Sequence, residues 1–176
     1  MSTFGSDPMH NVIYNGIVRD VKHNLESGLF RATIILVYAG IDSMAFFSMP
    51  HTQNEVTKTD FINWCDRYLR FDCAEKIGGI EFYSARCGVL HSYGSSSRIT
   101  NNGHARQIGY TDNSVPPIRF DKTIDKGLVL VSIRHLVESF IKGVNQCLID
   151  VFRDEANRPK SEARLNLMIH AFDVKQ

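Results

Sequence analysis

The chain has 176 residues, enough for one domain with a hydrophobic core. Its hydrophobic fraction of 43% and charged fraction of 22% are those of an ordinary globular protein. The net charge of +1 argues against a protein that scans DNA through its overall field, so any contact with nucleic acid needs a local group of basic residues.

The cysteines, histidines and glycines show no pattern of a known metal or nucleotide site. There is no CxxC, HExxH or HxH arrangement and no glycine-rich phosphate loop. We therefore expect no metal, no cofactor and no disulfide-stapled secreted domain. The first residues contain no basic segment followed by an apolar one, which predicts no signal peptide and a cytoplasmic location.

The first two predicted helices span residues 9–25 and 29–48. The first has apolar residues at helical spacing, and the second is apolar nearly all round, which is typical of a central helix. The uninterrupted apolar part of the second helix runs only from Ala32 to Ile41, whereas a membrane span needs roughly 20 residues. We therefore interpret it as a buried core helix and expect no membrane partner.

Two further helices are predicted before the middle of the chain. Thr59 is the expected N-cap of a short helix, after a polar connector at 51–58. The next helix spans about 75–93 and ends at Gly94, because glycine readily adopts the left-handed conformation of a C-cap. The short helix has an aromatic series at core spacing: Phe61, Trp64 and Tyr68.

Residues 95–127, here called the insert, are rich in Ser, Asn, Gly and Pro. Its segments 105–111 and 117–122 alternate like strands and are expected to pair as a small hairpin. Helices are predicted again at 128–155 and 160–171. The fold class is therefore expected to be all-α: one domain over 1–176, a bundle of about five to six helices interrupted by a long loop or small β-hairpin.

The stretch "YSARCGVLHSYG", from Tyr83 to Gly94, has the residues of a reactive site near a helix end. Arg86 and Tyr93 lie on one helical face, with Tyr83 close to it, but His91 points about 140° away from Arg86 in a regular helix. The two side chains converge if the last turn is distorted, or if two copies of the helix meet across a two-fold axis.

Arginine and histidine together suit one reaction in particular. The planar guanidinium of arginine matches a phosphate, and histidine accepts and donates protons near neutral pH. Cleavage of RNA by its own 2′-hydroxyl needs proton transfer and neutralisation of charge on the phosphate oxygens, and it needs no metal. The plainer alternatives are a salt-bridged structural Arg86 and a His91 stabilised by the negative end of its helix.

The motif Arg86-x4-His91 resembles the signature of the HEPN superfamily, small helical bundles that include metal-independent ribonucleases. The longer form, with Tyr93, is similar to HEPN toxins that are paired with a nucleotidyltransferase antitoxin. This resemblance implies catalytic roles for Arg86 and His91 and a homodimer in which two motifs meet. It also implies that Tyr93 is a target for adenylate attached by the antitoxin. Cys87 departs from the pattern, since many members carry a polar residue after the arginine.

Asp42 is a lone carboxylate in the apolar helix at 29–48. It either sits at a kink or solvated edge near Gly40, or pairs with Arg86 and orients its guanidinium. If Asp42 is buried it needs a partner, because an unpaired buried carboxylate is unfavourable, so both alternatives stay open.

The insert carries cations that are candidate RNA contacts, with Tyr110 and Phe120 as candidates for base stacking. The alternative is a solvated loop that covers one edge of the bundle. The candidate cations are Arg98, Arg106 and Arg119.

These observations favour a homodimeric, metal-independent endoribonuclease that acts on RNA as a toxin or defence protein. The alternative is a catalytically inactive bundle that binds a nucleotide, an RNA or a partner protein through the same groove. A third reading is an assembly protein that uses the helix predicted at 128–155 as its interface.

Overall fold

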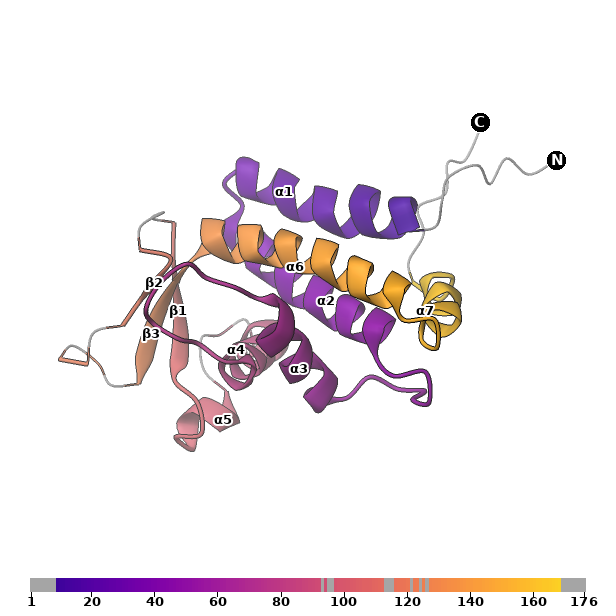
Figure 1. The fold of residues 1–176 in the computed structure, drawn as a ribbon. Coiled ribbons are helices and arrows are strands. Elements are labelled where there is room, and N and C mark those ends of the chain that lie inside the picture. Colours follow the sequence, from indigo (N-terminus) through magenta and orange to yellow (C-terminus); the bar gives the residue numbers. More distant parts are fainter. Residues whose placement is uncertain are drawn as a thin grey trace.

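The computed structural model describes residues 9–92, 94, 97–112, 116–120, 122, 123, 125 and 127–168, and this part of the chain is mostly helical with a small sheet (Figure 1). A π-helix, η1, begins the described part, and α-helices and three strands follow. In chain order the elements are η1 (His10–Val18), α1 (Arg19–Glu26), α2 (Phe30–Ser48), α3 (Lys58–Tyr68), α4 (Gly79–Ser92), α5 (Arg98–Asn101), β1 (Gln107–Thr111), β2 (Ile118–Arg119), β3 (Leu128–Ser132), α6 (Ile133–Arg153) and α7 (Arg158–Leu165).

Helix α2 is the centre of the fold. It packs against α1, α3, α4, α6 and α7. Within the described residues it is also the one helix long and apolar enough to cross a membrane. Val37, Tyr38, Ile41 and Met44 along it are nevertheless fully buried in the protein, as expected of a core helix.

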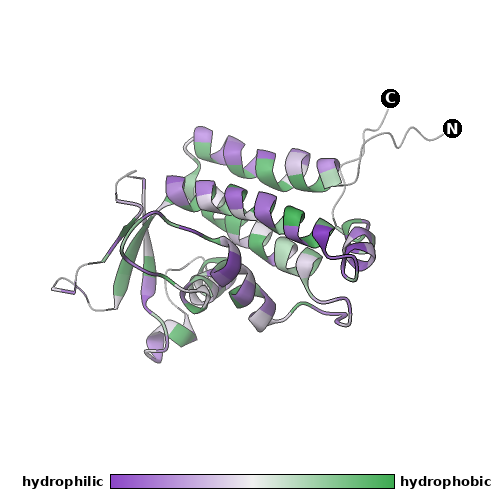
Figure 2. Ribbon diagram, in the orientation of Figure 1, coloured by the Kyte–Doolittle hydropathy of each residue, from purple (hydrophilic) through white to green (hydrophobic). Residues whose placement is uncertain are grey.

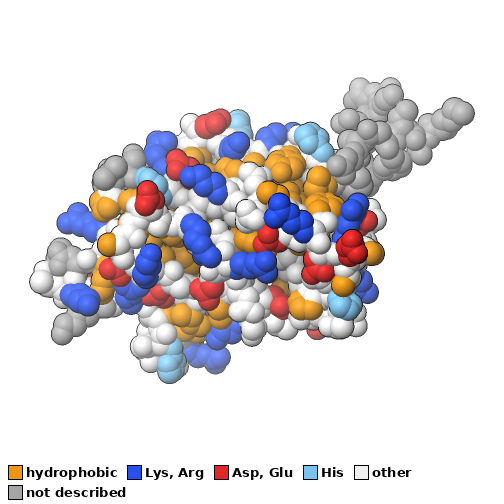
Figure 3. All heavy atoms as spheres, in the orientation of Figure 1, with side chains coloured by type: hydrophobic (Ala, Val, Ile, Leu, Met, Phe, Trp, Pro, Cys, Tyr) orange, Lys and Arg blue, Asp and Glu red, His pale blue; other side chains and the backbone are white. Residues whose placement is uncertain are grey.

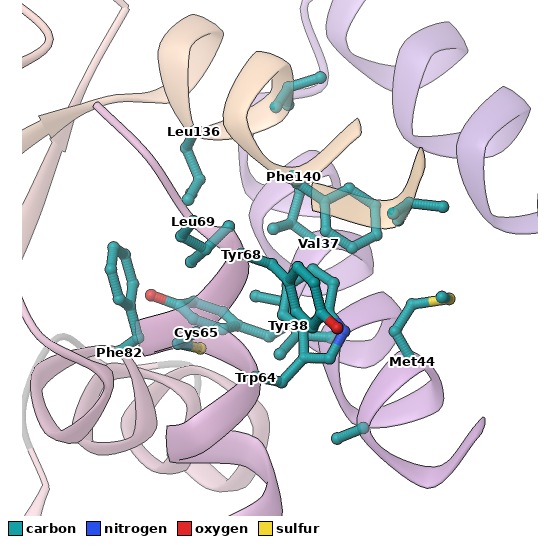
Figure 4. Packing of buried hydrophobic residues seen from close by; sticks show 14 of the residues in the cluster. Val37, Tyr38, Met44, Trp64, Cys65, Tyr68, Leu69, Phe82, Leu136 and Phe140 are labelled. Carbon is teal, nitrogen blue, oxygen red and sulfur yellow. The ribbon is translucent and has the colours of Figure 1, made fainter. Parts of the chain in front are cut away.

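The hydrophobic core lies where α2, α3, α4 and α6 meet (Figure 4). Tyr38 and Met44 enter it from α2, Phe82 from α4, and Leu136 and Phe140 from α6. Helices α1 and α6 are amphipathic, with polar residues on their outer faces, whereas α2 is apolar along most of its length (Figure 2). The aromatic series of α3 is buried as predicted, at Phe61, Trp64 and Tyr68.

Helix α3 begins two residues earlier than predicted. Its N-cap is Thr57, whose hydroxyl accepts from the Asp60 backbone N–H while the Asp60 carboxylate accepts from the Thr57 N–H at 2.7 Å. This reciprocal capping box satisfies two free backbone donors, an arrangement that the predicted cap, Thr59, does not have.

The three strands form a mixed sheet in the order β1-β3-β2. Strand β1 pairs in parallel with β3, from Gln107 opposite Leu128 to Thr111 opposite Ser132, and β2 pairs antiparallel with β3. The predicted hairpin is therefore wrong, because the segments 105–111 and 117–122 both pair with a third strand. The mostly helical fold is confirmed, and the purely all-α class is corrected to a helical protein with a small sheet.

The third strand comes from residues predicted to be the start of the long helix at 128–155. Residues 128–132 form β3, and α6 begins at Ile133 after the Ser132 side chain caps its N-terminus. The predicted last helix at 160–171 is observed as α7, Arg158–Leu165, and its positions after 168 lie outside the described residues. The first predicted helix is observed in two parts, the π-helical η1 and then α1.

Candidate functional site

The motif lies on α4, which is held against α3 by close backbone packing. A side chain at Gly79 would overlap the backbone of Ile62, so a glycine is required where α4 begins. Phe82 and Ala85 point into the core. Arg86 is the next residue along the helix and lies at the rim of this buried face.

Arg86 contacts Asp42 across the interface of α4 with α2. Its Nε donates to Asp42 Oδ2 at 2.9 Å, and its Nη2 lies 2.9 Å from the same oxygen. The side chains are 23% and 29% exposed, so the pair is mostly shielded but reaches the surface. The predicted contact between Asp42 and Arg86 is thus present, and the orienting role of Asp42 remains a prediction.

Burial and charge act in opposite directions on this pair. Burial raises the pKa of the Asp42 carboxyl above its ordinary value, although the hydrogen bond and charge of Arg86 partly counter it. Burial alone would lower the pKa of Arg86, but its hydrogen bond to Asp42 and the charge of that carboxylate raise it overall. Arg86 is therefore a permanent cation in a site that is only partly solvated.

His91 meets Arg86 within a single chain. Its Nε2 lies 3.4 Å from Arg86 Nη1, and because a guanidinium only donates, Nε2 is the acceptor in the tautomer that carries its proton on Nδ1. The long arginine side chain spans the turn between them. The helix also ends irregularly, because the Gly94 N–H donates to the Gly88 carbonyl at 3.1 Å, six residues back instead of four. A second copy of the chain is not needed for the contact between Arg86 and His91.

Tyr83 lies one turn before Arg86. Its ring packs edge-on against Phe61 of α3, with centroids 5.6 Å apart, which fixes its position. Burial raises the pKa of Tyr83, and the neighbouring Cys87 side chain, which is hydrogen-bonded to it, adds to the shift. Cys87, which departs from the family pattern, therefore contacts the site.

Sequence reasoning missed Lys58, whose Nζ lies 5.3 Å from the centre of the Tyr83 ring. The available signal was a basic residue at the start of a helix, where the helix dipole disfavours it. The prediction of Thr59 as N-cap hid this signal, because it placed Lys58 outside the helix.

The predicted RNA contacts of the insert are in different environments. Arg98 is exposed at the start of α5, which is tied to α4 by hydrogen bonds of 2.6 Å between the Ser84 hydroxyl and the hydroxyls of Ser97 and Thr100. Arg119 is exposed on β2.

Arg106 is instead enclosed by structural partners. It pairs with Glu75 at 2.6 Å and Glu81 at 2.5 Å, and its guanidinium stacks on the Phe120 ring. These partners indicate a structural role for Arg106, and the RNA contact remains a prediction. The Phe120 ring contacts this cation and also Lys122, and the Tyr110 hydroxyl is hydrogen-bonded to the Tyr38 hydroxyl, so both aromatic side chains have partners within the chain.

Tyr93, the predicted modification target, lies outside the described residues. The described residues contain no group of three or more His, Cys, Asp or Glu side chains that could hold a metal ion. On the face shown in Figure 3, basic and acidic side chains are interspersed, in keeping with the net charge of +1.

The chain was compared with known proteins in three ways. A scan against protein-family models gave no match, and neither the curated proteins nor the solved structures contained a similar chain.

Proposed function

We propose that this protein is a metal-independent endoribonuclease of the HEPN type, which acts as a cytoplasmic homodimer in a toxin–antitoxin or defence system. The observation that carries the proposal is the connected series of Asp42, Arg86 and His91. A cation held by a carboxylate on one side contacts an exposed imidazole on the other. The resemblance of the Arg86-to-Tyr93 motif to this family supports the same function.

The geometry supports a separate chemical role for each of the three residues. The 2′-hydroxyl of the RNA attacks the adjacent phosphorus, its proton leaves to a base, and the departing 5′-oxygen takes a proton from an acid. His91 provides proton transfer, and Arg86 neutralises charge that develops on the phosphate oxygens. Asp42 fixes the guanidinium from behind, since both contacting nitrogens meet the same carboxylate oxygen.

The homodimer supplies the second proton-transfer group. One imidazole cannot hold and lack a proton at the same time, so His91 of one copy acts as base and His91 of the other as acid. Mixing a fixed amount of wild-type protein with a growing excess of His91→Ala chains tests this arrangement. A mixed dimer holds a single His91, so the activity per wild-type chain is expected to fall as mixed dimers form, and an unchanged activity per wild-type chain would contradict the arrangement.

The central test is cleavage of single-stranded RNA by the purified protein in the presence of a metal chelator. We expect His91→Ala to lower the rate about 10²- to 10⁴-fold, the usual contribution of a general acid or base. His23→Ala is the matched control, because His23 is an exposed histidine near the end of α1 and should leave the rate unchanged.

Two results would overturn the proposal: loss of activity on chelation, or equal rates for the wild type and His91→Ala. RNA binding without cleavage by the wild type would instead support the catalytically inactive bundle. In cells, expression of the wild type should arrest growth, and His91→Ala should relieve the arrest. A nucleotidyltransferase antitoxin would be identified by adenylate on Tyr93 after co-expression.

A further inference from the structure

Lys58 occupies a position that the stability of its own helix does not explain. It is the first helical residue of α3, directly after the Thr57 cap, at the positive end of the helix dipole. A cation is disfavoured there. No ion pair among the described residues includes Lys58, so a carboxylate does not offset the unfavourable placement. Residues that act against local stability are expected where a protein binds its ligand.

The neighbours of Lys58 place its charge beside the candidate site. Its Nζ lies over the ring of Tyr83, 5.3 Å from the centroid, and this ring is one helical turn from Arg86. Phe61 holds the ring edge-on from the core side. The lysine is exposed, so its ammonium remains open to solvent while the ring restricts where it lies.

The side chains therefore form a row that crosses from α3 to α4, two helices that pack side by side (Figure 1). Lys58 comes first, the Tyr83 ring second, and the Arg86 guanidinium with Asp42 and His91 third. A row with a cation near each end matches a polyanion that passes over both, with one phosphate at each cation.

We infer that Lys58 is a substrate-binding residue that contacts an RNA backbone phosphate next to the one on which Arg86 and His91 act. This inference rests on the proposed ribonuclease function. Lysine suits the task, since its ammonium is a point charge that donates to a phosphate from several directions and requires no particular base. Tyr83 acts as a positioning residue, because it orients Lys58 and does not itself contact the phosphate.

The test measures RNA binding separately from cleavage. Binding of a fluorescently labelled, mixed-sequence single-stranded RNA is followed by anisotropy over a range of salt concentrations, in the His91→Ala background so that the RNA stays intact. Lys58→Ala should weaken binding several-fold and reduce the slope of log affinity against log salt by about 0.7, the value for one lost phosphate contact on a single strand. Lys58→Arg should retain both.

Two controls separate binding from folding. Lys160→Ala removes another exposed lysine at the start of α7, a helix that packs on α2 and α6, and should leave affinity and slope unchanged. Lys58→Ala should not lower the melting temperature, because it removes a cation from the positive end of a helix. In the active protein, Lys58→Ala should raise KM and leave kcat within about twofold of the wild type.

The outcomes distinguish this inference from the function on which it rests. Unchanged affinity and slope in Lys58→Ala would overturn the inference even if cleavage depends on Arg86 and His91. Cleavage that persists in His91→Ala would overturn the catalytic proposal, while weaker binding by Lys58→Ala would still establish the phosphate contact. Absence of RNA binding by the parent His91→Ala protein would overturn the inference as well.

Discussion

Two arginines hold α4 to its neighbours, and they differ in the kind of partner that their nitrogens meet. Arg106 has an acceptor for each nitrogen of its guanidinium: Glu81 for Nε, Glu75 for Nη1 and the Lys76 carbonyl for Nη2. Arg86 directs Nε and Nη2 to one carboxylate oxygen of Asp42, while Nη1 faces the exposed His91.

Exposure does not distinguish the two arginines, since each side chain is 23% exposed. Their partners distinguish them. Arg106 lies between two carboxylates on a phenyl ring and holds the segment before β1 against the start of α4. Arg86 keeps one edge of its guanidinium directed outward beside a group that can transfer protons. The comparison predicts that an arginine held by two carboxylates and a backbone carbonyl has a structural role, and that one whose outer nitrogen meets an exposed histidine can bind a substrate.

The largest effect expected from this comparison is on catalysis. Arg86→Ala should lower the rate of RNA cleavage about 10²- to 10³-fold, because a preorganised donor to the phosphate oxygens is lost. Initial rates at saturating RNA measure the effect. Arg106→Ala is the matched control, with the rate taken under conditions where the variant is fully folded. Similar losses in both variants would contradict the distinction between the two arginines.

For stability, Arg106→Ala is expected to have a larger effect than Arg86→Ala. Arg106→Ala leaves Glu75 and Glu81 without their shared cation and should lower the free energy of unfolding by about 2 kcal/mol, less than for a fully buried pair because solvent reaches these groups. Urea denaturation measures the change. Arg86→Ala should have a smaller effect, since a single carboxylate loses its partner. A larger loss in Arg86→Ala would make Arg86 the structural residue instead.

The contact between Asp42 and Arg86 could be predicted because both residues stand out locally. Asp42 is a lone acid in an apolar helix, and Arg86 belongs to a short motif, so their pairing was one of the alternatives that the sequence offered. The contact of Arg86 with His91 was not fixed by spacing. It depends on the reach of the arginine side chain and on the irregular end of α4, which one-helix geometry does not describe.

The sheet shows a different limit of prediction from the sequence. An apolar run such as Leu128–Ser132 is compatible with both a buried helix and a buried strand. Its pairing with Gln107–Thr111 decides the outcome, and such long-range partners leave no local pattern. The Arg106 network was missed for the same reason, because Glu75 and Glu81 lie 31 and 25 residues away from it in the chain.

An intermediate effect is expected for Asp42→Asn, which preserves shape but removes the charge behind Arg86. The rate of cleavage should fall about tenfold, and the free energy of unfolding should change by less than about 1 kcal/mol, since the amide oxygen still accepts from the guanidinium. Paired rate and urea measurements check this. A variant that loses stability but retains the wild-type rate would make the pair structural, like that of Arg106.

The contribution of Asp42 to stability should depend on pH with the sign expected for a carboxyl whose pKa is raised by burial. Its pKa is raised by burial, so the native state holds this proton more tightly than the unfolded state does. The stability of the wild type relative to Asp42→Asn is therefore expected to be greatest in acid, below the ordinary aspartate pKa of about 4, and to decline as pH rises through the raised value. The opposite trend in urea denaturation across this range would contradict the assignment.

The smallest effect concerns Asp60, a carboxylate with a purely structural setting. Burial alone would raise its pKa, but hydrogen bonds from Thr57 and Gln53 lower it below the ordinary value. Its contribution to stability is therefore present above about pH 4 and lost as pH falls through the lowered pKa, the reverse of Asp42. Asp60→Asn should lower the free energy of unfolding by about 0.5–1 kcal/mol near neutral pH, and the difference from the wild type should vanish in acid. If urea denaturation instead shows a difference that grows in acid, then the two carboxylates behave alike. Their electrostatics would then not distinguish the candidate site around Asp42 from the N-terminal cap of α3.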